Sequence, residues 1–201
     1  MNLPNSLTVG RIFLVPLLLV VLLTKPEGWR LFEISKEALG AVIFGVASLT
    51  DWLDGYVARR RKQVTGLGQW MDPLADKLLV TAALLSLLKM NLAPAWMVAV
   101  ILGREFFVTV LRSIVHARGQ ALPASPIGKI KLGAQVIAIL VLILGRGPLQ
   151  QILVLGQAAL WVATLAAIVS AMDYWRRFNR LPAVRPAGVA GSDVPRGRVS
   201  A

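Results

Sequence analysis

Residues 51–76 read DWLDGYVARRRKQVTGLGQWMDPLAD, and this stretch decides how the whole chain is interpreted. It holds four of the ten acidic residues of the protein: Asp51, Asp54, Asp72 and Asp76. Apolar segments flank it on both sides, and a carboxylate inside hydrocarbon is costly unless it is paired, bound to a metal ion or exposed to a wet cavity. Four clustered carboxylates therefore predict a functional site, and a divalent metal cluster is the simplest explanation.

The composition favours an integral membrane protein. Hydrophobic residues make up 56% of the 201 residues, and the mean hydropathy is +0.67. The formal net charge is +12, but the basic residues flank apolar segments, so we expect contacts with membrane lipids and no nucleic-acid partner. The chain has no cysteine and a single histidine, His116, so any metal site must use oxygen ligands.

The apolar segments predict an all-α fold: a polytopic membrane protein with six transmembrane helices. The expected spans are residues 7–24, 38–57, 67–88, 94–115, 130–144 and 151–175. Most have the length that a hydrocarbon layer of roughly 30 Å requires. We expect residues 1–180 to form a six-helix catalytic domain. Residues 181–201, rich in Pro, Gly, Ala and Arg, are predicted to be a basic, disordered cytoplasmic tail.

The distribution of Lys and Arg predicts the orientation in the membrane. Six spans place both termini on one side, together with the basic loop 59–62, the connection 118–131 and the tail. Positive loops face the cytoplasm, so we expect a protein of the bacterial cytoplasmic membrane. The acidic stretch flanks the first cytoplasmic loop, and its chemistry should therefore open to the cytoplasm.

The spacing of the acids predicts two carboxylate pairs. Asp51 and Asp54 are three residues apart, whereas Asp72 and Asp76 are four apart. Both spacings put the two side chains on one face of a helix. Hard divalent cations such as Mg²⁺ or Mn²⁺ would offset the repulsion among four carboxylates, and a pair of such ions about 3.5–4 Å apart suits phosphoryl chemistry. One carboxylate is also available as a general base.

Other residues of the stretch suit a phosphate ligand. Gly55 and Gly68 permit close approach of a ligand, although helix packing alone explains them equally well. Arg59 lies one turn beyond Gly55 and suits a phosphate, and Thr65 adds a hydroxyl. The neighbouring bases 60–62 are better explained as a determinant of topology.

The complete pattern resembles the signature of the CDP-alcohol phosphotransferases. It reads Asp51-x2-Asp54-Gly55-x2-Ala58-Arg59-x8-Gly68-x3-Asp72-x3-Asp76. Members transfer a substituted phosphate from a CDP-linked donor to an alcohol and release CMP. The resemblance implies that the four aspartates bind two divalent cations, and that Asp76 also deprotonates the acceptor hydroxyl. It implies contacts to the CDP-lipid from Asn5, Thr8, Gly55, Arg59, Thr65 and Gly68.

Three further segments are similar to the bacterial phosphatidylglycerophosphate synthases of that family: NLPNSLTVGRIFLVP from residue 2, LGREFFVTVLR from residue 102 and GKIKLGAQ from residue 128. Leu132 stands where that branch usually has Thr. This resemblance implies CDP-diacylglycerol as donor and sn-glycerol 3-phosphate as acceptor, and the family commonly forms homodimers.

A phosphorylated acceptor needs cationic groups near the metals. The candidates are Arg112, Arg118, Lys129 and Lys131, with Lys129 slightly preferred over Lys131. Arg104 and Glu105 fall in the middle of a predicted span, and two roles stay open for them: a structural ion pair, or part of the acceptor pocket.

Two other functions compete with this interpretation. One is the same chemistry with a different acceptor: inositol phosphate, phosphatidylglycerol or serine. The other is a cation or proton transporter that uses the four aspartates as ion ligands. Against the transporter, the acids gather at one membrane face and only Glu105 extends an acidic path across the bilayer.

Overall fold

The computed structural model of the chain is predominantly helical, as expected. It describes the backbone of residues 3–24, 30–31, 34–61, 66–119 and 126–180, and the side chains of these ranges except 3–8, 30, 51–61, 66–73, 126–127 and 129. The six α-helices of the described residues are α1 (Leu3–Leu19), α2 (Lys36–Arg61), α3 (Gly66–Lys89), α4 (Ala95–Ala117), α5 (Pro126–Arg146) and α6 (Leu153–Asn179). Each corresponds to one predicted segment.

The helices extend beyond the predicted spans at most ends. Helix α2 begins two residues before its predicted start and runs to Arg61, because backbone hydrogen bonding continues where the side chains become polar. Helix α5 begins at Pro126, four residues ahead of the expected start, and proline is well tolerated in a first helical turn. Helix α6 begins two residues later than expected, because Gln150–Ile152 form a short 3₁₀ turn, η2.

Two short elements were not predicted. Val20–Thr24 continue α1 as a π-helical turn, η1. In the predicted polar loop, β1 (Arg30–Leu31) pairs with β2 (Ile34–Ser35) in antiparallel register. Two-residue strands leave little hydropathy signal, and they do not change the all-α class.

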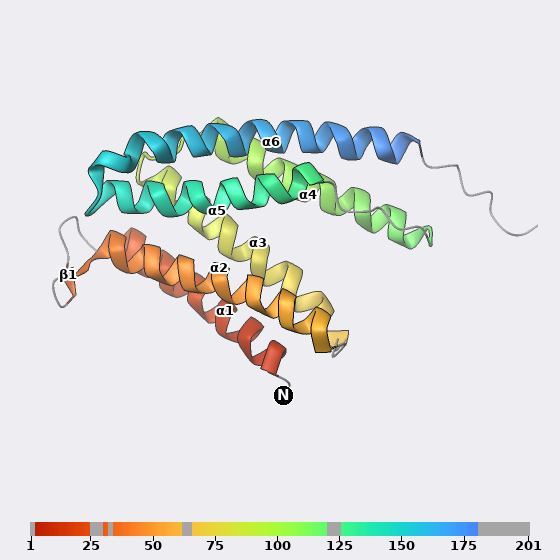
Figure 1. Cartoon of the computed structure of the whole chain (residues 1–201), viewed down its shortest axis with the longest axis horizontal. Coiled ribbons are helices and arrows are strands. Elements are labelled where there is room, and N and C mark those ends of the chain that lie inside the picture. Colours follow the sequence, from red (N-terminus) through yellow and green to blue (C-terminus); the bar gives the residue numbers. More distant parts are fainter. Residues whose placement is uncertain (1–2, 25–29, 32–33, 62–65, 120–125, 181–201) are drawn as a thin grey trace, which may run out of the picture.

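The helices form two groups joined by α3 (Figure 1). Helices α1 and α2 lie together on one side, whereas α5 and α6 run antiparallel beside each other, with α4 packed on α6. Helix α3 crosses between the groups and packs against α1, α4 and α5. Leu18, Phe44, Leu84, Ile101 and Leu142 are fully buried in one continuous core that spans both groups.

A close approach of α5 and α6 depends on small residues. A Cβ atom at Gly156 would lie 2.8 Å from Leu142 Cδ2 and 3.1 Å from the Leu142 backbone nitrogen. The first distance is too short for a real contact and the second is unusually tight, so a larger residue would force the Leu142 side chain and its backbone to shift. Gly156 thus sets the spacing of α5, the helix that carries part of the candidate site.

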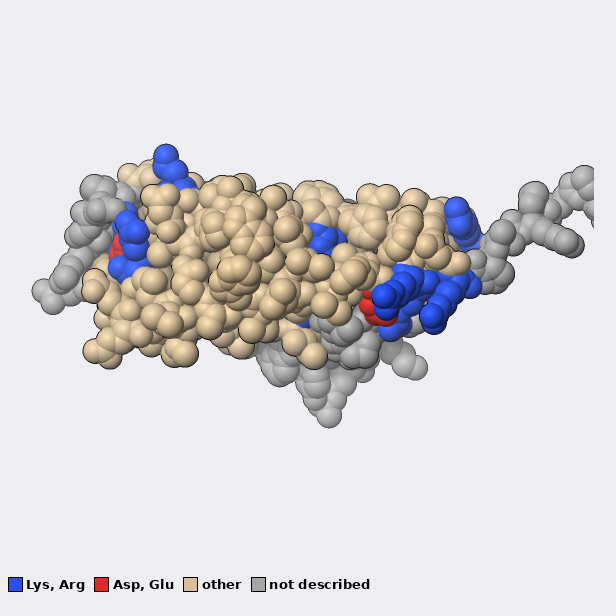
Figure 2. Space-filling view, turned by 90° about the horizontal axis from the view of Figure 1, so that it is seen from above, with Lys and Arg blue, Asp and Glu red and all other residues tan. Residues whose placement is uncertain are grey.

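The surface is apolar over much of its area. Phe13 on α1, Phe106 on α4 and Val154 on α6 are each more than half exposed, although they are large apolar side chains. Figure 2 shows Lys and Arg gathered toward the two ends of the molecule, with few charges between them on this face. One helix of the described residues, Gln150–Asn179, is long and apolar enough to cross a membrane by length and composition. The six-span topology itself stays a prediction.

Candidate active site

The predicted site falls at the end of α2 and the start of α3. The backbone of Asp51 and Asp54 belongs to α2, and that of Asp72 and Asp76 belongs to α3. Of these four side chains, the structure describes only that of Asp76. The predicted contacts to the CDP-lipid also lie outside the described side chains, so their roles stay predictions. They are Asn5, Thr8, Gly55, Arg59, Thr65 and Gly68.

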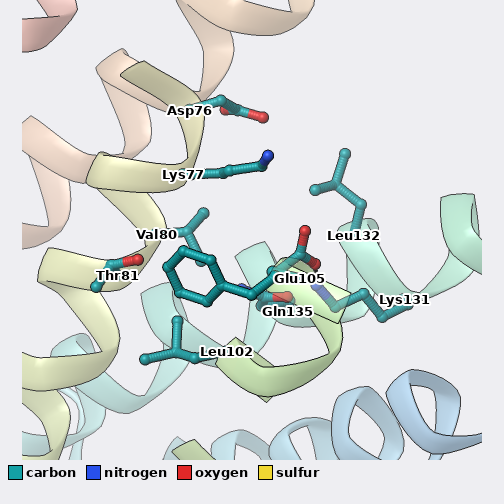
Figure 3. A pocket seen from close by; sticks show the side chains of 10 residues that line it. Asp76, Lys77, Val80, Thr81, Leu102, Glu105, Lys131, Leu132 and Gln135 are labelled. Atoms are coloured by element: carbon teal, nitrogen blue, oxygen red, sulfur yellow. Dashed lines mark hydrogen bonds and ion pairs between the residues drawn. The ribbon is translucent and has the colours of Figure 1, made fainter. Parts of the chain in front are cut away.

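Asp76 is half-buried on α3 and lines two cavities. The first, here called the polar cavity, lies between α3, α4 and α5 and has a volume of about 30 Å³. Its lining consists of Asp76, Lys77, Val80, Thr81, Leu102, Glu105, Phe106, Lys131, Leu132 and Gln135 (Figure 3). It thus brings Asp76 together with a second carboxylate, two cations and an amide in a mostly apolar region.

The second cavity, here called the apolar groove, has a volume of about 410 Å³. Its lining comes from α2, α3 and α5: Gly45, Ser48, Leu49, Asp76, Leu79, Val80, Leu132, Gly133, Val136 and Leu140. Asp76, Val80 and Leu132 belong to both linings. Asp76 is the only carboxylate among the described residues of this groove, so the groove suits an apolar group whose polar end reaches that residue.

Glu105 is the centre of a buried ion network. Its Oε1 atom accepts hydrogen bonds from Lys131 Nζ and from Arg104 Nη1, the latter at 3.2 Å. Lys131 is only 1% exposed and Arg104 only 10%, so both cations are largely removed from water. Arg104 Nη2 also donates to Ser170 Oγ at 2.6 Å, which connects the network to α6. One carboxylate therefore holds two cations and links three helices.

A second chain of contacts connects α3 to the same network. Lys77 Nζ donates to Thr109 Oγ1 at 2.7 Å, and Thr109 Oγ1 donates to the backbone carbonyl of Glu105 at 2.6 Å. Lys77 directly follows Asp76, so this contact restrains the helical turn that carries Asp76. Helices α3, α4 and α5 thereby meet at the polar cavity, and α6 is connected to it through the Arg104–Ser170 hydrogen bond.

These contacts settle part of the sequence interpretation of Arg104 and Glu105. Both residues make the structural ion pair that was one of the two expected roles. Glu105 also lines the polar cavity, so the other expected role is compatible with the geometry.

The three predicted acceptor cations whose side chains are described do not gather at one place. Lys131 lines the polar cavity, whereas Arg112 is exposed on α4. Arg118 lies at the end of α4, with its guanidinium 5.5 Å from the centre of the Phe178 ring. The side chain of Lys129 lies outside the described residues, so the preference for it over Lys131 stays a prediction.

Two polar residues of the polar cavity had no predicted function, Thr81 and Gln135, and Lys77 had been expected only as a counter-charge beside Asp76. Gln135 follows Lys131 by four residues, which places both on one face of α5. That spacing was the available signal, and it would have singled out Gln135 once Lys131 was proposed as a site residue.

The donor chemistry of the acidic stretch fits divalent cations. Among the described side chains, no group of three metal-ligating residues comes together, but three of the four predicted ligands lie outside that part of the chain. Asp76, the described one, lines the polar cavity. Carboxylate oxygens are the ligands that Mg²⁺ and Mn²⁺ prefer.

Comparison with known proteins agrees with the sequence signature. Residues 1–169 match the CDP-alcohol phosphatidyltransferase family. A Bacillus subtilis protein named CDP-diacylglycerol–glycerol-3-phosphate 3-phosphatidyltransferase is 44% identical over 183 residues, which cover 88% of this chain and 94% of that protein. A Rickettsia felis protein of the same name is 34% identical, over 87% of this chain and 94% of its own length. A Pseudomonas fluorescens protein of that name is 35% identical, over 88% of this chain and 89% of its own length. The chain belongs to the CDP-alcohol phosphatidyltransferase family.

Proposed function

We propose that this protein transfers the phosphatidyl group of CDP-diacylglycerol to sn-glycerol 3-phosphate and so forms phosphatidylglycerophosphate and CMP. The observation that carries the proposal is the match to three proteins named for this reaction, over at least 87% of this chain in each case. Each match covers nearly the full length of this chain and of the relative, so it includes the helices that line both cavities.

Asp76 is the proposed catalytic base. Its carboxylate takes the proton from the 1-hydroxyl of the acceptor, and the resulting oxygen attacks the β-phosphorus of CDP-diacylglycerol. A new bond forms between that oxygen and phosphorus, and the bond from phosphorus to the bridging oxygen breaks as CMP leaves. The position of Asp76 at the junction of the two cavities supports this role, because the donor and the acceptor must meet there.

Two divalent cations, Mg²⁺ or Mn²⁺, are proposed to be held by Asp51, Asp54, Asp72 and Asp76. When bound, they neutralise the diphosphate and stabilise the negative charge that develops on the leaving CMP. Gly55, Arg59, Thr65 and Gly68, with Asn5 and Thr8, are proposed to contact the cytidine diphosphate. The spacing of these residues in the sequence supports both assignments.

The two cavities suggest how substrates of opposite character bind. An acyl chain of the donor is proposed to occupy the apolar groove, whose lining is mainly aliphatic. The phosphate of the acceptor is proposed to bind at one or more of four cations, with Lys129 slightly preferred over Lys131: Arg112, Arg118, Lys129 and Lys131. A positive side chain on the polar cavity supports this choice, because it favours a phosphorylated acceptor over serine or phosphatidylglycerol.

The proposed arrangement is a homodimer in the bacterial cytoplasmic membrane, with six spans per chain and the site open to the cytoplasm. Residues 1–180 are the proposed catalytic domain and residues 181–201 the cytoplasmic tail. The apolar surface and the charges at the two ends of the molecule support a membrane position.

The chain has no cysteine, so Arg60→Cys and Asn91→Cys each create a single reporter thiol with which the orientation can be tested. An impermeant reagent outside cells should label Cys only at position 91; labelling at position 60 would refute the orientation.

An acceptor screen tests the function. Protein reconstituted with CDP-diacylglycerol and Mg²⁺ or Mn²⁺ should release CMP with sn-glycerol 3-phosphate and should form phosphatidylglycerophosphate on thin-layer analysis. Inositol phosphate, serine and phosphatidylglycerol should give little CMP. Faster release with any of these three would transfer the assignment to that acceptor, and cation flux without CDP-lipid would favour a transporter.

A further inference from the structure

Gln135 is a buried amide whose hydrogen-bonding groups are unused within the described part of the chain. The residue lies on α5 and is 1% exposed. Neither its Nε2 nor its Oε1 atom has a hydrogen-bond partner there. Buried polar side chains in folded proteins nearly always have such partners, so an unused amide calls for an explanation.

The position of Gln135 points to a ligand. Its side chain lines the polar cavity, beside Glu105 and Lys131 and in the same cavity as Asp76 (Figure 3). Glu105 and Lys131 bond to each other, and neither of them forms a hydrogen bond with the Gln135 amide. By contrast, Gln157 on α6 donates its amide to the Leu92 carbonyl at 2.7 Å, as a structural glutamine should.

We propose that Gln135 recognises the C2 hydroxyl of the acceptor, the hydroxyl that the reaction leaves intact. This inference rests on the proposed function. An amide offers one acceptor and two donors, and a hydroxyl is a neutral group that pairs with both kinds. Such a partner satisfies Gln135 without adding another charge beside the Glu105 network.

The size of the cavity agrees with this assignment. Its volume of about 30 Å³ has room for a group of the size of a hydroxyl or a water molecule, not for a complete acceptor. The acceptor therefore reaches into the cavity with one group while its reacting end stays near Asp76. A deoxy acceptor would leave Gln135 unsatisfied and would bind less well.

The test compares two acceptors in three proteins. The acceptors are sn-glycerol 3-phosphate and 3-hydroxypropyl phosphate, which lacks only the C2 hydroxyl. The proteins are the wild type, Gln135→Met and the control Gln157→Met, which removes an amide of structural type. We measure kcat/KM for CMP release by reconstituted full-length protein.

The wild type and Gln157→Met should prefer sn-glycerol 3-phosphate by about tenfold, as the loss of one buried hydrogen bond implies. Gln135→Met should reduce the preference to within about twofold, through a lower rate with the natural acceptor and an unchanged rate with the analogue. Wild-type preference in Gln135→Met would overturn the inference. Equal losses with both acceptors would also overturn it, because that result indicates a structural role.

If Gln135→Met does not fold, Gln135→Asn retains the amide but withdraws it by one methylene, and it should also reduce the preference. An unchanged preference in that variant would overturn the inference. Failure of the proposed function gives a different result: the wild type then releases CMP with neither acceptor.

Discussion

Glu105→Gln should destabilise the protein much more than Lys131→Met, although both break the same ion pair. Glu105 is the only hydrogen-bonding partner of Lys131 among the described residues, and Lys131 is 1% exposed. Loss of the carboxylate therefore removes the hydrogen-bonded counter-charge of a buried ammonium, which retains only its Coulombic attraction to Asp76. It also removes the carboxylate partner of Arg104. Breaking a buried pair in this way costs roughly 3–5 kcal/mol. The amide oxygen of the new side chain still accepts a hydrogen bond worth about 1 kcal/mol, so we expect a net loss of about 2–4 kcal/mol.

Lys131→Met leaves the remaining charged residue, Glu105, with a partner. Glu105 keeps the Arg104 guanidinium at 3.2 Å, and methionine replaces most of the apolar stem of lysine. The expected loss is about 1 kcal/mol or less, because the remaining charge is still paired. The double variant removes the charges of Glu105 and Lys131 and leaves Arg104, which keeps its hydrogen bond to Ser170, without the carboxylate. It should still be more stable than Glu105→Gln alone, which leaves both cations without the carboxylate, with a coupling of about 2 kcal/mol between the two sites.

Reversible unfolding in mixed detergent micelles measures all three free energies. Arg177→Met is the matched control, because Arg177 bonds Asp173 at 3.0 Å but its side chain is 38% exposed. That pair should contribute less than about 0.5 kcal/mol. The reasoning fails if Glu105→Gln is as stable as Arg177→Met, or if the double variant is no more stable than Glu105→Gln.

Three further predictions concern catalysis and packing. Asp76→Asn should lower CMP release by at least about a hundredfold while the melting temperature stays unchanged, because the amide cannot accept the acceptor proton; a near-normal rate would remove Asp76 as the base. Chelation of divalent cations should stop CMP release, and either Mg²⁺ or Mn²⁺ should restore it; turnover that continues in excess chelator would contradict the metal site. Gly156→Ala should destabilise the protein by about 1–3 kcal/mol in thermal unfolding, since its Cβ would lie 2.8 Å from Leu142 Cδ2. Gly103→Ala, whose Cβ has no neighbour within 4 Å, should be neutral or slightly stabilising, and equal effects of the two changes would refute the packing argument.

The number and order of the helices were predictable from the sequence, because polar turns separate long apolar runs. Their ends were less predictable. Hydropathy detects where side chains become polar, whereas a helix ends where its backbone hydrogen bonds end, as at Ala117 in α4. The η2 turn before α6 and the β1–β2 pairing depend on local backbone geometry in segments of two or three residues, where periodicity carries no signal.

For the candidate site, the family was predictable from the sequence, whereas the contacts among its side chains were not. The signature around Asp76 led to the family, which the comparisons confirm. The partners of the mid-helix charges were not predictable, because Glu105 and Lys131 are separated by 26 residues and meet only because α4 and α5 both pack against α3 and α6. Periodicity was enough to put Gln135 on the face of Lys131, although this was not predicted, and its unused amide follows from how α3, α4 and α5 enclose the cavity.

The two cavities at Asp76 explain why a charge network so close to the apolar groove is useful. Under the proposed function, a lipid donor and a water-soluble acceptor must react at one carboxylate, and their binding sites need opposite chemistry. The apolar groove and the polar cavity share Asp76, Val80 and Leu132, so the separation between them is a single layer of side chains. Pairing Lys131 with Glu105 places a cation at this boundary while limiting the cost of burying it. The charge balance of the network and the selectivity for the acceptor should therefore be coupled: variants that unpair Lys131 should change acceptor preference more than affinity for the donor.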